Sequence, residues 1–348
     1  MVPVGICGHY GGGKVFLDGQ TVKTKTITAE LKKHFGDDEV LTVDTYGGAR
    51  KIFKHLTQLR RLTAECENVI ILPAHNGIRI FAPFLTFINR FYRHRLHYVV
   101  IGGWLPKLLS KHHSLVSKLK QFDCIYVETS GMAKKLEAMG FDNITVMKNC
   151  KDLQILSPKN LKTEFEEPYP LCTFSRVNKE KGIEDAVEAV ENVNRVLGRT
   201  VFSLDIYGQI EETYQERFQS IQELFPEYIR YSGCVPFEQT TDVLRSYYAM
   251  IFPTHYFTEG IPGSVIDAYA SGVPVISARW ENFQDIIQEN VTGFGFDFED
   301  YKGLECILEE CSRNPSKLLN LRKNCLQEAQ KYLPAQELSV LIKNLNRG

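Results

Sequence analysis

The chain has 348 residues, of which 43% are hydrophobic and 24% are charged, proportions that are typical of a globular protein and exclude a disordered one. The length exceeds one ordinary core and predicts two domains of roughly 150–170 residues. We find no apolar window of about 18 residues and no signal-peptide pattern, and nine scattered cysteines without a CxxC pair favour a cytosolic protein without a metal site.

The net charge of −1 hides an uneven distribution along the chain. The first 150 residues hold 21 basic and 12 acidic residues, whereas the remainder holds 20 basic and 30 acidic ones. A basic half predicts an anionic partner, such as nucleic acid, lipid headgroups or a lipid-diphosphate substrate. The plainer interpretation is a solvated surface whose charge is spread unevenly.

Strand and helix patterns alternate along the first 150 residues. A strand at 2–7 precedes a glycine-rich loop at 8–20. Helices are predicted at 21–34, 49–63 and 80–92, and further strands at 40–43, 69–72, 98–101, 124–127 and 144–147. The alternation predicts a doubly wound α/β domain over residues 1–150.

The alternation of strand and helix patterns is interrupted at 151–168, a polar stretch with two prolines that predicts a linker. It resumes after this stretch. Strands are predicted at 171–176, 201–207, 229–233, 250–252 and 273–276, and helices at 182–197, 211–225, 240–248 and 264–270. A strand–helix unit at 286–311 and helical segments at 315–346 complete the chain. We expect a second α/β domain at 169–330, a final helix at 331–348 that packs toward the first domain, and a cleft across which the two Rossmann-like domains face each other.

Two carboxylates follow the strand at 250–252. Glu259 lies in the loop before the helix at 264–270, and Asp267 lies inside that helix. Carboxylates suit sugar hydroxyls, and the helix N-terminus suits a phosphate. The alternative is a helix-dipole partner plus a solvated helix aspartate.

Two cations, Arg176 and Lys181, lie between the strand at 171–176 and the next helix. Five residues apart across a turn, they are able to converge on one diphosphate and stabilise its charge as it departs. The alternative is two exposed basic residues in a polar loop, although their place at the strand's carboxyl end favours a site.

The loop at 8–20 begins with GxxxxGK, but Val15 replaces the Ser or Thr of a P-loop, so we reject a nucleoside triphosphatase. Its glycines still permit close approach of a substrate.

His75 follows the strand at 69–72 and is either a candidate catalytic group or a local hydrogen-bonding residue. The helix at 80–92 combines aromatic and basic residues, which fits either membrane-surface attachment or a buried core helix with a basic rim. RNA binding is a third possibility, but no RNA-binding motif is present.

Four segments carry a resemblance to a known family. They are FSRVNKEKG at 174–182, LDIYGQ at 204–209, the long run at 231–277 and VTGFGF at 291–296. Together they resemble glycosyltransferase family 4, over about residues 170–300 and more weakly in the first domain. The resemblance implies a GT-B fold and a retaining enzyme that uses a nucleotide sugar, without metal or other cofactor.

The resemblance also implies roles for residues of the second domain. Arg176 and Lys181 match the diphosphate-binding residues. Glu259 begins the family's E-x7-E motif and is expected to contact the donor sugar, and Asp267 replaces its second glutamate, which contacts the ribose. The remaining donor-binding positions are Tyr207, Gly208 and Val235 near the base, and Gly260, Ile261, Gly263, Ser264 and Val265 near the sugar and phosphate.

The first domain departs from the family pattern. Many members carry a histidine after a strand, but here the matching stretch ends in Gly102, Gly103 and Trp104. His75 or a backbone group is then expected to replace it. Gly12, Gly13 and Lys23 are expected to belong to a loop on the acceptor side.

The expected function is transfer of a sugar, from a UDP-sugar donor, onto a growing lipid-linked or oligosaccharide acceptor in bacterial polysaccharide synthesis. We expect a cytoplasmic enzyme without a nucleic-acid partner, whose basic half meets an anionic membrane from the inner side. The alternatives are a sugar-nucleotide epimerase of the same fold and a non-catalytic glycan-binding or scaffold subunit. An epimerase needs acid and base groups on both faces of the sugar.

Overall fold

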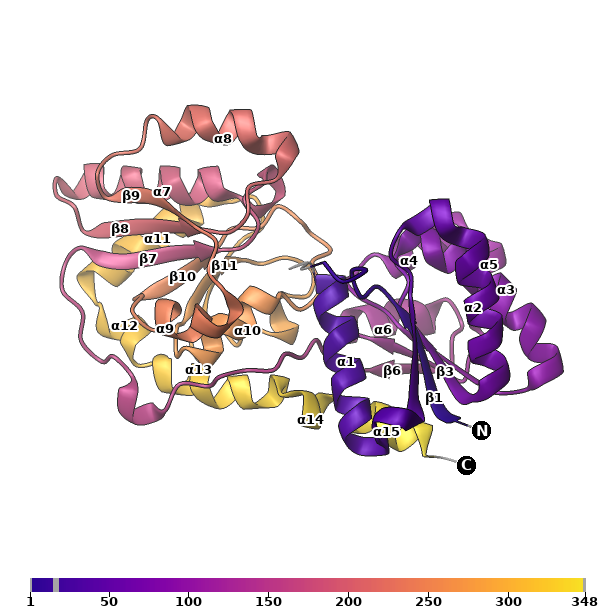
Figure 1. Ribbon diagram of the computed structural model, residues 1–348. Coiled ribbons are helices and arrows are strands. Elements are labelled where there is room, and N and C mark those ends of the chain that lie inside the picture. The colour runs from indigo at the N-terminus through magenta and orange to yellow at the C-terminus, as the bar shows by residue number, and fades with distance from the viewer. Residues whose placement is uncertain (1, 15–18, 347–348) are drawn as a thin grey trace. The chain divides into compact units, whose positions relative to one another are not determined.

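A computed structural model describes residues 2–14 and 19–346 (Figure 1). The chain divides into two compact units, of which the first contains Met1–Asp152 and Tyr332–Gly348 and the second contains Leu153–Lys331. The described strands form two six-stranded parallel sheets, one in each unit. The α/β class predicted from the alternating pattern is confirmed. Residues 15–18 of the predicted glycine-rich loop lie outside the described residues.

The first sheet has the strand order β2-β1-β3-β4-β5-β6. Its strands are β1 (Val2–Gly8), β2 (Val40–Asp44), β3 (Cys66–Ile71), β4 (Arg95–Val99), β5 (Cys124–Val127) and β6 (Ile144–Val146). The helices of this unit are α1 (Gly19–Phe35), α2 (Ile52–Glu65), α3 (His75–Tyr92), α4 (Leu105–Lys111), α5 (His113–Leu119), α6 (Ser130–Ala138), α14 (Pro334–Glu337) and α15 (Ser339–Leu345).

Two cores lie on opposite faces of this sheet, since residues alternate between faces along each strand. One core joins Val69 and Ile71 of β3 to the buried sides of α2, α3, α4, α5 and α6. The other joins Val4 and Ile6 of β1 to α1 and α15. In Figure 1, α1 and α15 accordingly lie on one side of the sheet and α2, α3 and α5 on the other.

The second sheet has the order β12-β11-β10-β7-β8-β9. Its strands are β7 (Tyr169–Phe174), β8 (Phe202–Tyr207), β9 (Ile229–Gly233), β10 (Ala249–Phe252), β11 (Val275–Ala278) and β12 (Gly293–Phe296). The helices of this unit are α7 (Ile183–Leu197), α8 (Gln215–Gln222), α9 (Thr240–Leu244), α10 (Gly263–Ala270), α11 (Tyr301–Arg313), α12 (Ser316–Leu319) and α13 (Arg322–Ala329). Their apolar stripes pack on the sheet, with α7, α8 and α11 sharing one core and α10 in contact with α9 and α13.

Several predicted elements were wrong in their bounds, among them α3, which begins at His75 rather than at 80, and α8, which spans Gln215–Gln222 rather than 211–225. β4 begins at Arg95 rather than at 98, because the polar His97 is buried within the strand. The strand expected from residue 286 begins only at Gly293, and Ile286 is instead buried in the preceding loop. α9 ends at Leu244 rather than at 248, where the buried Arg322 guanidinium donates hydrogen bonds to the carbonyls of Arg245 and Tyr247.

Candidate active site

The order of the second sheet identifies where a ligand is expected. β7 and β10 are neighbours, but the chain leaves β7 toward β8 and leaves β10 toward β11, on opposite sides. Open α/β sheets bind ligands outside the carboxyl ends of strands at such a switch point. The loop at 175–182 follows β7, and the loop at 253–262 follows β10. These two loops carry Arg176, Lys181 and Glu259, which the sequence indicated as ligand-binding residues.

Lys181 and Glu259 meet between these loops. The Lys181 Nζ lies 2.5 Å from the Glu259 Oε2, and the two side chains are 14% and 17% exposed. The same ammonium lies over the Phe252 ring at 5.2 Å from its centroid. An ammonium has three donors, so two remain available for another anion after the contact with Glu259. The pair therefore combines a reachable carboxylate with a reachable cation at the switch point.

Local hydrogen bonds fix the loop that carries Lys181. Asn178 caps the 3₁₀ turn at Lys179–Lys181 by accepting a hydrogen bond from the Lys181 backbone N–H at 3.1 Å. Its Nδ2 also donates to Glu211 at 2.8 Å. Gly182 follows with φ 65°, and a Cβ there would lie 1.9 Å from the Pro253 carbonyl oxygen. A glycine is required because the two loops approach so closely.

The loop that carries Glu259 is held from three sides. The His255 backbone N–H donates to the Glu180 carbonyl at 2.9 Å, which ties this loop to the first one. The Glu259 N–H donates to the Tyr256 carbonyl at 3.0 Å. The Nδ2 of Asn282, a residue after β11 that is 3% exposed, donates to the Glu259 carbonyl at 2.7 Å. Glu259 therefore projects from a backbone with little freedom.

Arg176 differs from Lys181. It is exposed, and its guanidinium makes no hydrogen bond or ion pair within the described part of the chain. It lies close enough to Glu211 to lower the pKa of that carboxyl, after the hydrogen bonds from Asn178 and Thr213. Arg176 thus presents its donors to solvent beside the switch point, as a diphosphate contact requires.

The predicted base-side residues lie at the ends of β8 and β9. The Tyr207 hydroxyl is hydrogen-bonded to the Tyr247 hydroxyl at 2.8 Å. Gly208 has φ 132°, and a Cβ there would lie 1.7 Å from the Ser175 carbonyl oxygen, so this glycine also serves the packing of the Arg176 loop. Val235 is half-buried in the loop after β9. Their roles toward a base stay predictions.

The predicted sugar and phosphate contacts surround the start of α10. Gly260 and Ile261 are buried, whereas Gly263 and Ser264 are half-buried. The N–H of Val265 already donates to the Pro262 carbonyl at 3.2 Å. Asp267 lies in the second turn of α10 and is 7% exposed, so it offers a ligand far less surface than Glu259 does. Its predicted ribose contact stays a prediction.

Sequence reasoning missed a polar cluster behind Glu259. The His255 Nε2 lies 2.6 Å from the Asp185 Oδ2, and the Tyr301 hydroxyl lies 2.7 Å from the His255 Nδ1. Burial raises the pKa of Asp185 despite its contact with His255. The cluster clamps the loop at 253–262 to the N-termini of α7 and α11. The signal was available, since His255 is the one histidine of the second unit's sequence and stands four residues before Glu259.

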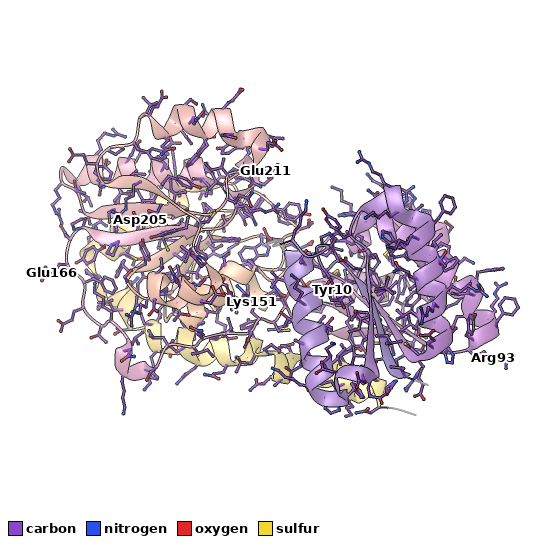
Figure 2. The ribbon with its side chains drawn as sticks, viewed as in Figure 1. Tyr10, Arg93, Lys151, Glu166, Asp205 and Glu211 are labelled. Atoms are coloured by element: carbon purple, nitrogen blue, oxygen red, sulfur yellow. The ribbon has the colours of Figure 1, made fainter. Side chains whose placement is uncertain are left out.

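The glycine-rich loop of the first unit lies at the corresponding switch point, between β1 and β3. Gly12 and Gly13 have φ values of 57° and 83° and are exposed. Asp44, at the end of β2, accepts hydrogen bonds from the N–H groups of Tyr10, Gly12 and Tyr46 at 2.8–2.9 Å. Burial opposes ionisation, but these donors prevail and lower the pKa of Asp44. Figure 2 shows Tyr10 beside α1, where its hydroxyl is hydrogen-bonded to Thr28 at 2.6 Å.

The expectation that Lys23 belongs to an acceptor-side loop was wrong. Lys23 lies in α1 and is 2% exposed, and its Nζ is 2.5 Å from the Oε1 of Glu128, which is 3% exposed. A buried lysine needs such a partner because desolvation of an unpaired charge is costly. The other Glu128 oxygen accepts a hydrogen bond from the Gly102 N–H at 3.2 Å. The pair thus fixes the Gly102 turn, which is the stretch where the sequence resemblance led us to expect a histidine.

His75 begins α3, after the carboxyl end of β3. Its ring stacks on Trp104 with centroids 3.9 Å apart, and burial lowers its pKa. The Trp104 Nε1 donates to the Ile101 carbonyl at 2.7 Å, which fixes the indole. The structure therefore brings His75 and the Gly102 turn together at one edge of the first sheet. A catalytic role for His75 stays a prediction.

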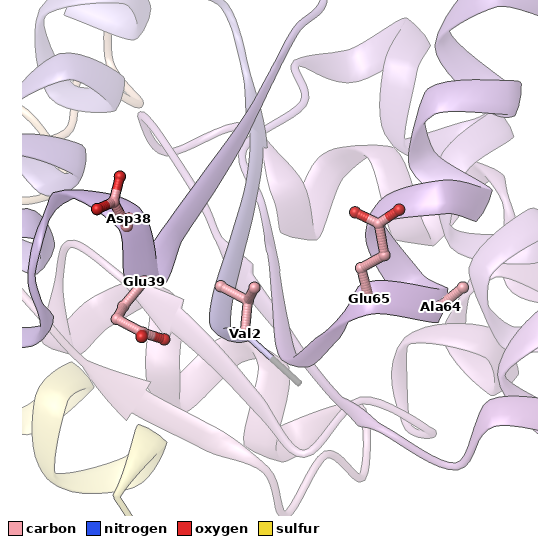
Figure 3. A pocket seen from close by; sticks show the side chains of 5 residues that line it. All are labelled: Val2, Asp38, Glu39, Ala64 and Glu65. Atoms are coloured by element: carbon pink, nitrogen blue, oxygen red, sulfur yellow. The ribbon is translucent and has the colours of Figure 1, made fainter.

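A hollow elsewhere in the first unit is lined by Val2, Asp38, Glu39, Ala64 and Glu65 (Figure 3). It lies where β1 and β2 begin, which is the sheet edge opposite to the carboxyl ends. Ligands of open α/β sheets bind at the other edge, and the three carboxylates repel phosphate. We therefore do not assign the site to this hollow.

The comparisons with known proteins concern the same region. The family model described as "Glycosyl transferases group 1" matches residues 159–332, which is half of the chain. The chain belongs to this family. Arg176, Lys181 and Glu259 all lie inside the matched residues. The chain is also similar to the amylovoran biosynthesis glycosyltransferase AmsK of Erwinia amylovora, with 21% identity over 193 residues that cover 53% of this chain and 47% of AmsK. The match thus spans about half the length of that curated relative.

Solved structures with the GT-B fold resemble the whole chain. Anabaena Alr3699/HepE, solved in complex with UDP and glucose, has a TM-score of 0.75 and 13% identity, with 98% of each chain covered. Sucrose-phosphate synthase from Thermosynechococcus elongatus has a TM-score of 0.73 and 14% identity, with 99% of this chain and 98% of that one covered. At these identities the likeness shows the fold. The group 1 glycosyltransferase has two parallel six-stranded sheets of GT-B type.

None of the helices in residues 2–14 and 19–346 combines the length and apolar character that crossing a bilayer requires. In the same residues, no three His, Cys, Asp or Glu side chains are grouped so as to hold a metal ion.

Proposed function

We propose that this chain is a retaining glycosyltransferase that moves a sugar from a UDP-sugar to a growing glycan during polysaccharide synthesis. The observation that carries the proposal is the Lys181–Glu259 pair at the switch point of the second sheet, with Arg176 beside it. The group 1 family match and the solved relatives that hold UDP or UDP-glucose support the choice of donor. The kinship with a polysaccharide-biosynthesis enzyme supports the choice of acceptor.

The donor diphosphate would lie against Arg176 and Lys181. As the bond between the sugar C1 and the phosphate oxygen breaks, negative charge grows on UDP, and fixed cations stabilise it. These two side chains supply the charge that a metal supplies in other enzymes, so we expect activity to persist in a chelator. Glu259 would accept hydrogen bonds from the sugar hydroxyls and orient the ring.

The acceptor hydroxyl would attack C1 from the face that UDP leaves, which retains the configuration. Its proton passes to the departing phosphate oxygen as the new C1–O bond forms. In this scheme Glu259 orients the donor and does not form a covalent intermediate. We place the acceptor, lipid-linked or a free oligosaccharide, on the first unit near His75 and Gly102. The nine free cysteines fit a cytoplasmic enzyme.

Calorimetric titration with UDP tests the donor site. Arg176→Gln and Lys181→Gln should each weaken UDP binding about tenfold or more, because each removes a charge-assisted hydrogen bond. Lys179→Gln is the matched control, since Lys179 is an exposed lysine of the same 3₁₀ turn and should leave affinity within about twofold. Equal affinity in all three variants would refute the assignment.

Turnover tests the reaction. Glu259→Gln should keep UDP affinity within a few fold and lower UDP release in the presence of acceptor by about a hundredfold or more. Nuclear magnetic resonance of the donor alone detects the competing epimerase activity as a new sugar signal. Binding of UDP without turnover on any glycan or lipid-linked acceptor would favour a scaffold subunit instead.

A further inference from the structure

Helix α3 presents an exposed aromatic stripe that the donor site does not use. Ile80, Phe87 and Phe91 are 41%, 59% and 77% exposed, and the half-buried Phe84 lies between them. Residues spaced by 4, 7 and 11 positions share one face of a helix. The Phe87 and Phe91 rings contact each other edge to face, with centroids 6.2 Å apart. Together these four side chains form the α3 stripe.

The opposite side of α3 is already used by the core. Phe81, Leu85 and Ile88 are at most 7% exposed and pack among the residues of the first unit's core. α3 contacts α2 and α5, and Figure 1 shows the three helices side by side on the same face of the sheet. Phe84 also packs against this core, so Ile80, Phe87 and Phe91 are the part of the α3 stripe that is additional apolar surface, beyond what folding requires. Exposed aromatics grouped in this way mark an interaction surface.

Uncompensated positive charge surrounds the stripe. Residues 68–122, which include α3, α4 and α5, contain eight lysines and arginines and no aspartate or glutamate. Arg79, Arg90 and Arg93 are exposed, and none of their guanidiniums makes an ion pair within the described residues. Arg93 ends α3 in the left-handed conformation with φ 59°, and Figure 2 shows it at the outer end of the helix.

We propose that α3 docks the protein onto an anionic lipid bilayer. Ile80, Phe87 and Phe91 insert among the headgroups, while Arg79, Arg90 and Arg93 lie at the level of the lipid phosphates. Aromatic side chains favour the bilayer interface, and basic residues are attracted to anionic leaflets without needing fixed partners. A protein partner would have to supply a carboxylate for each of these spread cations, whereas a leaflet supplies many phosphates at once. The docking goes beyond the proposed donor chemistry and does not depend on it.

Vesicle co-sedimentation tests the docking with the full-length protein. The wild type should bind vesicles of phosphatidylglycerol mixed with phosphatidylcholine, should bind pure phosphatidylcholine far less, and should be released by salt. Phe87→Ser combined with Phe91→Ser should lower the partition coefficient about tenfold or more. Arg79→Gln combined with Arg90→Gln should lower it about fivefold for each charge.

Matched control variants are available in the second unit. Val196→Ser with Leu224→Ser removes two apolar side chains that are 65% and 79% exposed, and Arg195→Gln with Lys302→Gln removes two exposed cations. These variants should bind vesicles as the wild type does. A UDP-induced thermal shift in every variant confirms that the protein is folded. If UDP gives no shift with the wild type, circular dichroism provides this check, so failure of the donor assignment leaves the vesicle result interpretable.

Two results would overturn the proposal. One is equal vesicle binding by the wild type and the Phe87/Phe91 variant. The other is a wild type that binds neither kind of vesicle but sediments as a dimer, while the Phe87/Phe91 variant sediments as a monomer. That result would make the α3 stripe a contact between two copies of the chain.

Discussion

Lys181 and Glu259 come from loops that are 78 residues apart in the chain, yet they share one hydrogen bond. The sequence indicated each residue separately, as a phosphate contact and as a sugar contact. It did not indicate the pair, because pairing depends on β7 and β10 becoming neighbours. The same limit explains Lys23, whose buried partner Glu128 lies 105 residues away. A charged residue that the sequence suggests as a ligand contact can therefore instead be paired with another residue of the same protein.

The carboxylate of Asp44 stabilises the glycine-rich loop of the first unit. It accepts three backbone hydrogen bonds, and its pKa in the folded chain lies below the value of about 3.9 in an unfolded chain. Unfolding therefore takes up a proton between these two values. The stabilisation by Asp44 is complete above the unfolded pKa and is lost as the pH falls through the folded pKa.

We predict that Asp44→Asn lowers the unfolding free energy at neutral pH by on the order of 2 kcal/mol, because hydrogen bonds to a charged group weaken. Urea unfolding checks this value. The difference from the wild type should shrink once the pH falls below the folded pKa. Asp38→Asn is the control. Asp38 is exposed on the same unit, so this substitution should leave the unfolding free energy unchanged at both neutral and acidic pH. A difference that stays constant from neutral to acidic pH would contradict the account.

At the scale of elements, most strands and helices followed from local pattern. Apolar runs of four to six residues predicted the buried parallel strands, and helical spacing predicted α7 and α10 to within a residue at each end. The misplaced elements depend on distant residues. α9 ends just before Arg245 and Tyr247, whose carbonyls accept hydrogen bonds from Arg322 of α13, and no local pattern predicts that contact.

The site divides in the same way. Arg176 and Glu259 lie at strand ends, so sequence placed them correctly at the carboxyl edge of the sheet. His255 is marked in the sequence as the one histidine of the second unit, but its partner Asp185 and the residue that binds the Glu259 carbonyl, Asn282, belong to no sequence motif. Recognising Asp185 and Asn282 required knowing that β10 lies beside both β7 and β11.

We predict that Gly208→Ala disturbs the Arg176 loop. The new Cβ would overlap the Ser175 carbonyl oxygen, which is 1.7 Å away, so the unfolding free energy should fall by about 3 kcal/mol or more and UDP affinity should fall with it. Gly233→Ala is the matched control. Gly233 also has a positive φ, of 76°, but its Cβ would meet no atom within 4 Å, so the cost should be about 1–2 kcal/mol of backbone strain with UDP affinity retained. Equal effects of the two variants, measured by denaturation and calorimetry, would argue against the clash.

At the scale of the whole molecule, the first unit is assembled from both ends of the chain. Leu338, Leu341 and Leu345 are at most 3% exposed and share a core with α1 and β1. The Arg95 guanidinium of β4 donates to the Leu345 carbonyl at 2.8 Å, which satisfies the C-terminal end of α15. The segment at 332–346 is therefore part of the first unit's core rather than an appendage.

We predict that Leu341→Ala destabilises the first unit by about 2–5 kcal/mol through the cavity that it creates. Hydrogen–deuterium exchange should show faster exchange in α1 and β1, with β7 and β8 unchanged. Leu308→Ala in the core of the second unit should give the reverse pattern. Equal acceleration across both sheets in either variant would mean that the two units unfold as one.

The return of the chain to its first unit has a consequence for protein synthesis. Domains fold as units while the chain is made. The second unit, Leu153–Lys331, is complete once its own residues have left the ribosome. The first unit is made earlier but waits for Leu338, Leu341 and Leu345 before the apolar surface of α1 and β1 is covered. A chain that stops near residue 331 would therefore carry a finished second unit and an unfinished first unit, and chaperones and proteases act on exposed apolar surface of that kind.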